Sequence, residues 1–188
     1  MKKILIICGL MAFNQAIAAD TYTLDPDHSY VLYDINHLGF STQSGKWKNV
    51  NGTISLDEQN PAKSKVDVTI KVGDDLVTGN PELDKHLKGE QFFEVAKYPI
   101  ATFVSDGVIT SNNKTAQVHG ILTLHGVSKP VTLDAVFNKK APNIITNKMT
   151  VGFSAKAKLK RSDFGMTTLI PALGDDVTLD IDVEAYKA

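Results

Sequence analysis

The chain has 188 residues, with 20 lysines and arginines against 21 aspartates and glutamates, so its formal net charge is −1 at pH 7. A near-neutral chain without a basic run lacks the positive surface that binds phosphate backbones, and we expect no nucleic-acid partner. Its length is typical of a single domain.

The first residues have the pattern of a secretory signal peptide. Two lysines precede a short apolar run, and small residues near position 18 form an A-x-A-like cleavage site. The apolar run is about ten residues, whereas a bilayer core requires about twenty. We predict a signal peptide over residues 1–19, cleaved after Ala18 or Ala19, and a mature domain over residues 20–188 in the periplasm. The single cysteine, Cys8, lies in the signal peptide, so the mature domain needs a hydrophobic core in place of disulfides.

Beyond this segment, clusters of glycine, proline and Asp/Asn separate short stretches in which apolar and polar residues alternate. Eight such stretches lie within residues 31–35, 47–56, 66–72, 101–109, 118–124, 131–137, 151–159 and 177–183. Alternation of this kind is typical of antiparallel strands. In the second stretch the apolar parity changes between Trp47 and Val50, which predicts a bulge. The stretch HGVSKP, between the fifth and sixth, predicts a tight hairpin.

One segment has the pattern of a helix. Asn80 can cap it, Pro81 suits its first position and Gly89 can end it. One short helix cannot cover a large sheet, but it can cover one end of a barrel. Closing eight strands into a barrel also hides both sheet edges. The predicted fold is therefore all-β: an eight-stranded antiparallel barrel with one short helix capping an end.

The inward-facing residues bear on whether such a barrel is packed or hollow. Several are small, namely Gly120, Ala135, Ala155 and Ala157, and most others are valine or leucine. A wall that is almost wholly uncharged favours an apolar, elongated guest. A packed interior without a guest stays open as the alternative.

Four stretches resemble the YceI-like family of periplasmic lipid- or polyisoprenoid-binding proteins. They are, in order between residues 25 and 166, DPDHSYVLYDINHLGFS, DKHLKGEQFFEVAKYPIATF, VHGILTLHGVSKPVTLD and LKRSDFGM. The resemblance implies a lipocalin-like barrel with an elongated apolar tunnel. It also implies an isoprenoid or similar long-chain amphiphile as guest, held for transport, storage or stress response, and no catalytic machinery. Trp47 departs from the family, in which phenylalanine is more frequent, and this alters pocket shape rather than class.

We predict that the guest lies against inward-facing side chains of the barrel wall. The predicted tunnel lining is Val31, Tyr33, Ile35, Trp47, Phe103, Leu122, Leu133, Phe153, Ala155, Ala157 and Leu179. Phe92 and Phe93, which follow the helix, are interpreted as a hydrophobic plug.

Two polar residues at strand ends are candidates for contact with the head group of the guest. His37 continues the inward parity of its strand, and Arg161 continues that of the strand ending near Leu159. The planar guanidinium of arginine suits a phosphate or carboxylate. Each residue also has a structural alternative: a hydrogen bond from His37 to the backbone, and a pair between Arg161 and Asp163 that holds a turn.

Metal and catalytic chemistry are not indicated. The five histidines show no close pair at ligand spacing and no cysteine partner, and no G-x-S-x-G stretch is present. The DHS at 27–29 has the residues of a turn. We therefore predict no metal, no cofactor apart from a bound lipid, and no enzyme. An enzyme acting on an isoprenoid or acyl lipid, and a guest-free barrel that acts through its surface, remain alternatives.

The outer surface leaves two further questions open. Lys156, Lys158 and Lys160 share the outward face of one strand. This row is interpreted as a solvated face, with transient contact to an anionic membrane as the alternative. A symmetric homodimer is an open alternative for the oligomeric state.

Overall fold

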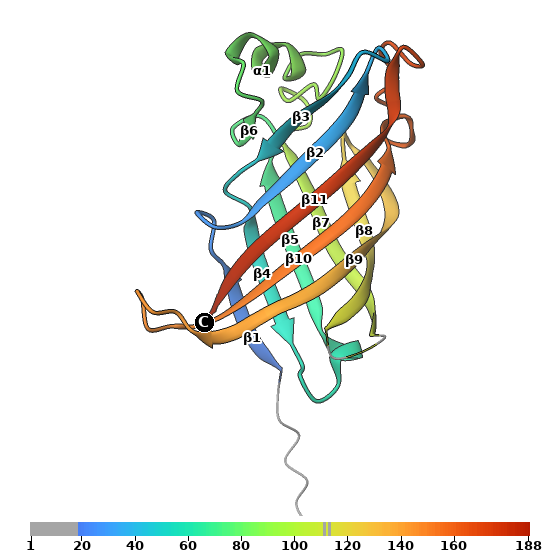
Figure 1. Cartoon of the computed structure of the whole chain (residues 1–188). Coiled ribbons are helices and arrows are strands. Elements are labelled where there is room, and N and C mark those ends of the chain that lie inside the picture. Colours follow the sequence, from blue (N-terminus) through green and yellow to red (C-terminus); the bar gives the residue numbers. More distant parts are fainter. Residues whose placement is uncertain (1–18, 111, 113) are drawn as a thin grey trace, which may run out of the picture.

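The computed structural model describes residues 19–110, 112 and 114–188 (Figure 1). The predicted signal peptide lies, up to residue 18, outside the described residues, so its cleavage stays a prediction. Among the residues that are described, no helix has both the length and the apolar character needed to cross a bilayer.

The described chain forms eleven strands, one α-helix and two short 3-10 helices. The strands are β1 (Asp20–Leu24), β2 (Tyr30–His37), β3 (Ser41–Trp47), β4 (Asn51–Leu56), β5 (Lys65–Lys71), β6 (Leu76–Val77), β7 (Ile100–Thr110), β8 (Thr115–Leu124), β9 (Val127–Pro142), β10 (Met149–Lys160) and β11 (Leu173–Lys187). The helical elements are η1 (Pro61–Lys63), α1 (Pro81–Leu87) and η2 (Arg161–Phe164).

Eight of these strands close into an antiparallel barrel. Their order is β1, β4, β5, β7, β8, β9, β10 and β11, and β11 pairs again with β1. β11 carries two neighbours along one edge, because Lys187 lies opposite Tyr22 of β1 while Ile181 lies opposite Val31 of β2. β2, β3 and β6 extend the wall at the end where α1 lies (Figure 1). We call this the upper end, and the end with the β4–β5 and β7–β8 connections the lower end.

The predicted barrel of eight antiparallel strands is confirmed, but one member differs. The alternation did not reveal β1, which has only five residues. Its two inward side chains, Tyr22 and Leu24, are almost fully buried. They pack with Val50, Val151 and Ala185, so the solid part of the interior lies where β1 closes the ring on β11.

The predicted bulge between Trp47 and Val50 is wrong. β3 ends at Trp47 and β4 begins at Asn51, and between them Asn49 takes a left-handed backbone conformation with φ of 54°. The Asn49 side chain donates a hydrogen bond of 2.8 Å to Asp75 Oδ1. The parity changes because the chain changes neighbours here: β3 pairs with β2, whereas β4 pairs with β1.

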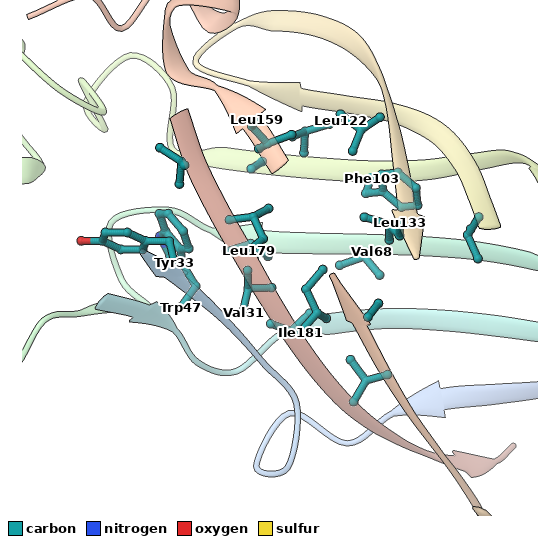
Figure 2. A pocket seen from close by; sticks show the side chains of 18 of the residues that line it. Val31, Tyr33, Trp47, Val68, Phe103, Leu122, Leu133, Leu159, Leu179 and Ile181 are labelled. Carbon is teal, nitrogen blue, oxygen red and sulfur yellow. The ribbon is translucent and has the colours of Figure 1, made fainter. Parts of the chain in front are cut away.

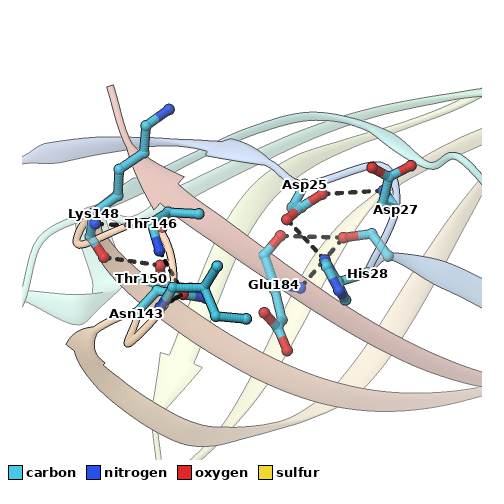
Figure 3. A network of polar contacts seen from close by, with 10 residues as sticks. Asp25, Asp27, His28, Asn143, Thr146, Lys148, Thr150 and Glu184 are labelled. Atoms are coloured by element: carbon cyan, nitrogen blue, oxygen red, sulfur yellow. Dashed lines mark hydrogen bonds and ion pairs between the residues drawn. The ribbon is translucent and has the colours of Figure 1, made fainter.

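The chain also turns between β1 and β2, at the sequence DPDHS (Figure 3). The buried Ser29 hydroxyl donates to Glu184 O at 3.1 Å and accepts from Glu184 N at 3.3 Å. Asp25 accepts a hydrogen bond from Asp27 N, and its other oxygen lies 2.9 Å from Nδ1 of His28. The turn predicted for this sequence is confirmed, and Ser29 ties it to β11.

The predicted helix and hairpin are also confirmed. Asn80 Oδ1 accepts hydrogen bonds from the backbone N–H groups of Glu82 and Leu83, at 3.1 and 3.3 Å, and a proline occupies the first helical turn. His125 and Gly126 join β8 to β9 with φ of 51° and 73°. Two successive left-handed residues are the signature of a type I′ hairpin.

Candidate binding cavity

A cavity of about 1060 Å³ occupies the barrel interior. Its wall extends from Leu83 and Leu87 of α1 at the upper end to Glu58 and Lys114 at the lower end. Between these ends the wall consists mainly of valine, leucine, isoleucine, alanine and phenylalanine (Figure 2). The interior is therefore hollow rather than packed, and its size is at the upper limit of small-molecule sites, which is about 1,000 Å³.

Ten of the eleven residues predicted to form the tunnel lining lie on the cavity wall. They are Val31, Tyr33, Ile35, Trp47, Phe103, Leu122, Leu133, Phe153, Ala155 and Leu179. Ala157 is the exception, since it is only 8% exposed and lies off the wall. Its side chain is a single methyl group, and the larger Leu159 and Leu179 beside it do reach the cavity. Contact between these side chains and a guest stays a prediction.

The small inward residues have different roles. Ala135 and Ala155 lie opposite each other on β9 and β10, and both face the cavity. Gly120 does not leave room for a guest. A Cβ at Gly120 would lie 2.6 Å from the Phe103 ring, so the ring fills the space that the glycine leaves. A small inward residue therefore does not by itself widen the interior, because a neighbouring strand can supply the group that fills the space.

An aromatic cluster lines the upper part of the cavity (Figure 2). The ring centroids of Tyr33 and Trp47 are 5.1 Å apart, and those of Trp47 and Phe93 are 5.3 Å apart in an edge-to-face arrangement. Trp47 Nε1 donates to Val72 O at 3.1 Å, which fixes the indole. A Cβ at Gly45 would lie 2.5 Å from Tyr33 Oη, so the Tyr33 ring lies against glycine on β3.

The Tyr33 phenol is held in its neutral form. Burial, with a smaller contribution from the Asp84 carboxylate on α1, raises the pKa of Tyr33 to about 12. An ordinary tyrosine is also uncharged at neutral pH, and the raised pKa extends the neutral form of Tyr33 to more alkaline solutions.

α1 and the segment after it cover the upper end. Leu83 and Leu87 are four residues apart, share one helix face and line the cavity. Phe92 and Phe93 also line it, and the Phe92 ring packs 4.9 Å from the His86 ring. This placement agrees with the predicted hydrophobic plug.

Arg161 lies on the cavity wall near the upper end and is 6% exposed. Its guanidinium donates four hydrogen bonds of 2.7–3.1 Å, to the carbonyl oxygens of Met166, Thr168, Leu173 and Gly174. The predicted pair between Arg161 and Asp163 is wrong. The guanidinium donates to these carbonyl oxygens instead, and Asp163 is exposed. Burial lowers the pKa of Arg161. Four of its five N–H groups are engaged, and the head-group role stays a prediction.

His37 is the second predicted head-group residue. It ends β2, is exposed, and lies on the cavity wall opposite Ser41 and Leu173 of the neighbouring strands. This placement is compatible with a position at the mouth, and contact with a head group stays a prediction.

The lower end of the cavity is polar, a feature that strand alternation does not predict. Glu58, Gln59, Asn112 and Lys114 reach the wall there. Glu58 also forms an ion pair with Lys140 of β9, and this hydrogen bond raises the pKa of Lys140. These side chains belong mainly to strand connections, where period-two alternation carries no information.

The histidines are dispersed over the structure. His119 Nδ1 lies 2.8 Å from Thr132 Oγ1, and His125 Nδ1 lies 3.0 Å from Phe164 O. Within residues 19–110, 112 and 114–188, no three side chains of His, Cys, Asp or Glu are grouped to hold a metal ion.

The lysine row on β10 faces solvent but is paired. Lys156 Nζ lies 2.5 Å from Asp180, while Lys158 and Lys160 lie 3.0 and 3.2 Å from Asp176. Each aspartate belongs to the adjacent β11. The pairing offsets the positive charge that attraction to an anionic membrane would require.

Comparison with known proteins identifies relatives over the whole barrel. A family model described as the YceI-like domain matches residues 22–185. A UPF0312 protein of Pseudomonas savastanoi is 40% identical over 93% of this chain and 89% of its own length. The crystal structure of the Campylobacter jejuni YceI protein is 31% identical, with a TM-score of 0.72, and the match covers 100% of this chain and 99% of that one.

A polyisoprenoid-binding domain from Saccharophagus degradans has the same fold. Its TM-score is 0.69, and the match covers 92% of this chain and 100% of that one. At 14% sequence identity, this likeness shows the fold alone.

Proposed function

Because the chain belongs to the YceI-like family, we propose that it holds a long-chain amphiphile, of isoprenoid type or a similar lipid, inside its barrel. It serves as a carrier for transport, storage or stress response. Its setting is the periplasm, to which the predicted signal peptide directs it. The shared fold of the Saccharophagus degradans polyisoprenoid-binding domain supports an isoprenoid chain as the guest.

One observation carries this proposal: the cavity is apolar along its middle and has polar side chains only near its ends. An apolar chain fits the middle, and a polar head fits an end. Each CH₂ removed from water contributes about 0.8 kcal/mol, and 1.4 kcal/mol is about tenfold in affinity. About ten buried methylenes therefore contribute enough for micromolar binding without specific polar contacts, before the cost of ordering the chain.

The arrangement supports binding without chemistry. An enzyme would place a nucleophile or base, with an orienting partner, beside the guest. Titratable side chains on the wall are instead divided between the ends, with His37 and His86 at the upper end and Glu58 at the lower. The intervening wall is hydrocarbon.

The direct test is to purify the mature protein from its native host and extract it with organic solvent for mass spectrometry. We expect a stoichiometric long-chain lipid in the extract, and uptake of a fluorescent prenyl or acyl probe by the emptied protein. The absence of both would contradict the carrier function. A probe recovered in chemically altered form would favour an enzyme.

A matched pair of variants tests the location of the guest. Ala155→Phe adds a ring to the cavity wall, whereas Val136→Phe adds one to the 42%-exposed outward position on β9, opposite Ser154. Displacing about two methylenes of the guest lowers affinity about tenfold. We expect this loss for Ala155→Phe and an unchanged affinity for Val136→Phe, with thermal melts verifying that both fold. Equal affinities would place the guest elsewhere.

A further inference from the structure

Three exposed apolar side chains surround the upper mouth of the cavity. Leu38 and Phe40, in the β2–β3 turn, are 44% and 89% exposed, and Leu169, in the β10–β11 connection, is 61% exposed. The two segments are neighbours, because His37 lies opposite Leu173 in the ladder. We call these three side chains the apolar rim. Leu38 and Leu169 also line the cavity, so the rim is continuous with its hydrocarbon wall.

The backbone at the rim does not favour leucine. Leu38 and Leu169 have φ of 57° and 62°, in the left-handed region that bulky side chains rarely adopt. Asparagine and glycine suit this region better, and asparagine occupies it at Asn49 and Asn147. The two leucines therefore expose hydrocarbon to water and hold a disfavoured backbone conformation as well. Neither property stabilises the fold.

The rim is held in a defined shape by hydrogen bonds. Arg161 binds two carbonyl oxygens of the connection that carries Leu169 and two at the start of β11, and Leu173 N donates to Leu169 O at 2.8 Å. In the other turn, Gly39 N donates to Asn36 Oδ1 at 2.9 Å. The exposed side chains thus project from two fixed loops.

The stretch of each loop that carries the rim side chains has no charged residue. The sequence from Leu38 to Gly45 has none, and neither has the sequence from Phe164 to Gly174. An uncharged surface can enter a lipid interface without the large cost of removing ions from water. The same surface would make no ion pair with a charged protein partner.

From these observations we propose that the apolar rim is a docking surface for a lipid bilayer, through which the guest passes between the bilayer and the cavity. This inference rests on the proposed carrier function. A chain that crosses the rim moves from bilayer hydrocarbon to the side chains of Leu38 and Leu169 and then to the barrel wall, so little of it meets water.

The β9–β10 hairpin provides a control. Ile144 and Ile145 at its tip are 99% and 88% exposed. Both are more exposed than the two leucines of the apolar rim. The hairpin lies at the lower end (Figure 1), its two isoleucines are not part of the cavity wall, and Lys139 and Lys148 flank them in the sequence. If exposed hydrocarbon alone determined bilayer contact, this tip would matter most.

The experiment is flotation of the mature protein with phosphatidylcholine vesicles, followed by transfer of a fluorescent prenyl probe from vesicles to protein. Phe40→Ser removes the most exposed rim side chain, and Ile145→Ser removes a matched side chain at the tip. We expect Phe40→Ser to reduce the vesicle partition coefficient and the transfer rate about tenfold, and Ile145→Ser to change neither. Phe40 lies off the cavity wall, so probe affinity in solution stays unchanged.

A second variant excludes misfolding as the cause. Leu38→Asn/Leu169→Asn replaces hydrocarbon with a residue suited to the left-handed backbone, so the protein remains folded while flotation falls. No flotation of the wild type, loss of flotation in Ile145→Ser but not in Phe40→Ser, or binding only to anionic vesicles at low salt would each overturn the proposal. Flotation through the rim without any guest uptake would support docking and contradict the carrier function.

Discussion

The two ends of the barrel share its long strands but differ in chemistry. At the upper end lie α1, the cluster of Tyr33, Trp47 and Phe93, and the two loops that carry the apolar rim. At the lower end lie polar connections and the ion pair between Glu58 and Lys140. The difference shows that strand alternation determines the middle of the cavity and places Tyr33 and Trp47, whereas the connections supply the other groups at each end. Because the upper end buries the larger aromatic cluster, we expect changes there to have the larger effects on stability.

The largest difference in stability between the two ends is expected for aromatic residues. Trp47→Ala removes a buried indole that contacts two rings and hydrogen-bonds Val72, and we expect a loss of about 3–5 kcal/mol in the free energy of unfolding. Phe137→Ala at the lower end removes a half-buried ring 5.4 Å from Phe153, and the loss should be smaller. Urea unfolding monitored by far-UV circular dichroism measures both. Equal losses would contradict the difference between the ends.

The second comparison of stability is between Arg161 at the upper end and Lys140 at the lower end. Arg161→Met leaves four carbonyl oxygens without their donor, and we expect a loss of about 2–4 kcal/mol. Lys140→Met breaks a partly exposed ion pair with Glu58, which contributes about 0–1 kcal/mol.

Arg161→Lys refines this comparison, because it keeps the charge but cannot reach four carbonyls at once. The same unfolding measurement should place it between wild type and Arg161→Met. If Arg161→Lys is as stable as wild type, charge rather than the fork of donors stabilises the loop.

The smallest effect is expected at the turn between β1 and β2. The hydrogen bond to Asp25 raises the pKa of His28 above its ordinary value of 6.5. The stabilisation is therefore fully present below the pKa of the unfolded state and is lost as the pH rises through the higher pKa of the folded state. We expect His28→Gln to lower the free energy of unfolding by a few tenths of a kcal/mol at about pH 5.5, because the pair is largely exposed. At about pH 8.5 this loss should shrink, and a loss that is equal at both pH values would exclude the ion pair.

Local sequence signals predicted local structure well. The Asn80 cap and the His125–Gly126 hairpin depend on residues close in the sequence, and both are confirmed. The features that these signals did not predict depend on distant partners. Gly120 is filled by Phe103, Arg161 finds carbonyl oxygens up to 13 residues away, and the parity change after Trp47 marks a change of neighbouring strand.

The sequence by itself determined the middle of this protein: an antiparallel barrel whose inward residues are apolar and partly small. Alternation with a period of two places the apolar residues on one face of each strand, and that face is the one that the fold buries. Only the tertiary structure decided the ends. Leu38 and Leu169 are 131 positions apart in the chain. They meet at one mouth because β2 pairs with β11, and strand pairing across such a distance has no signature in the local pattern.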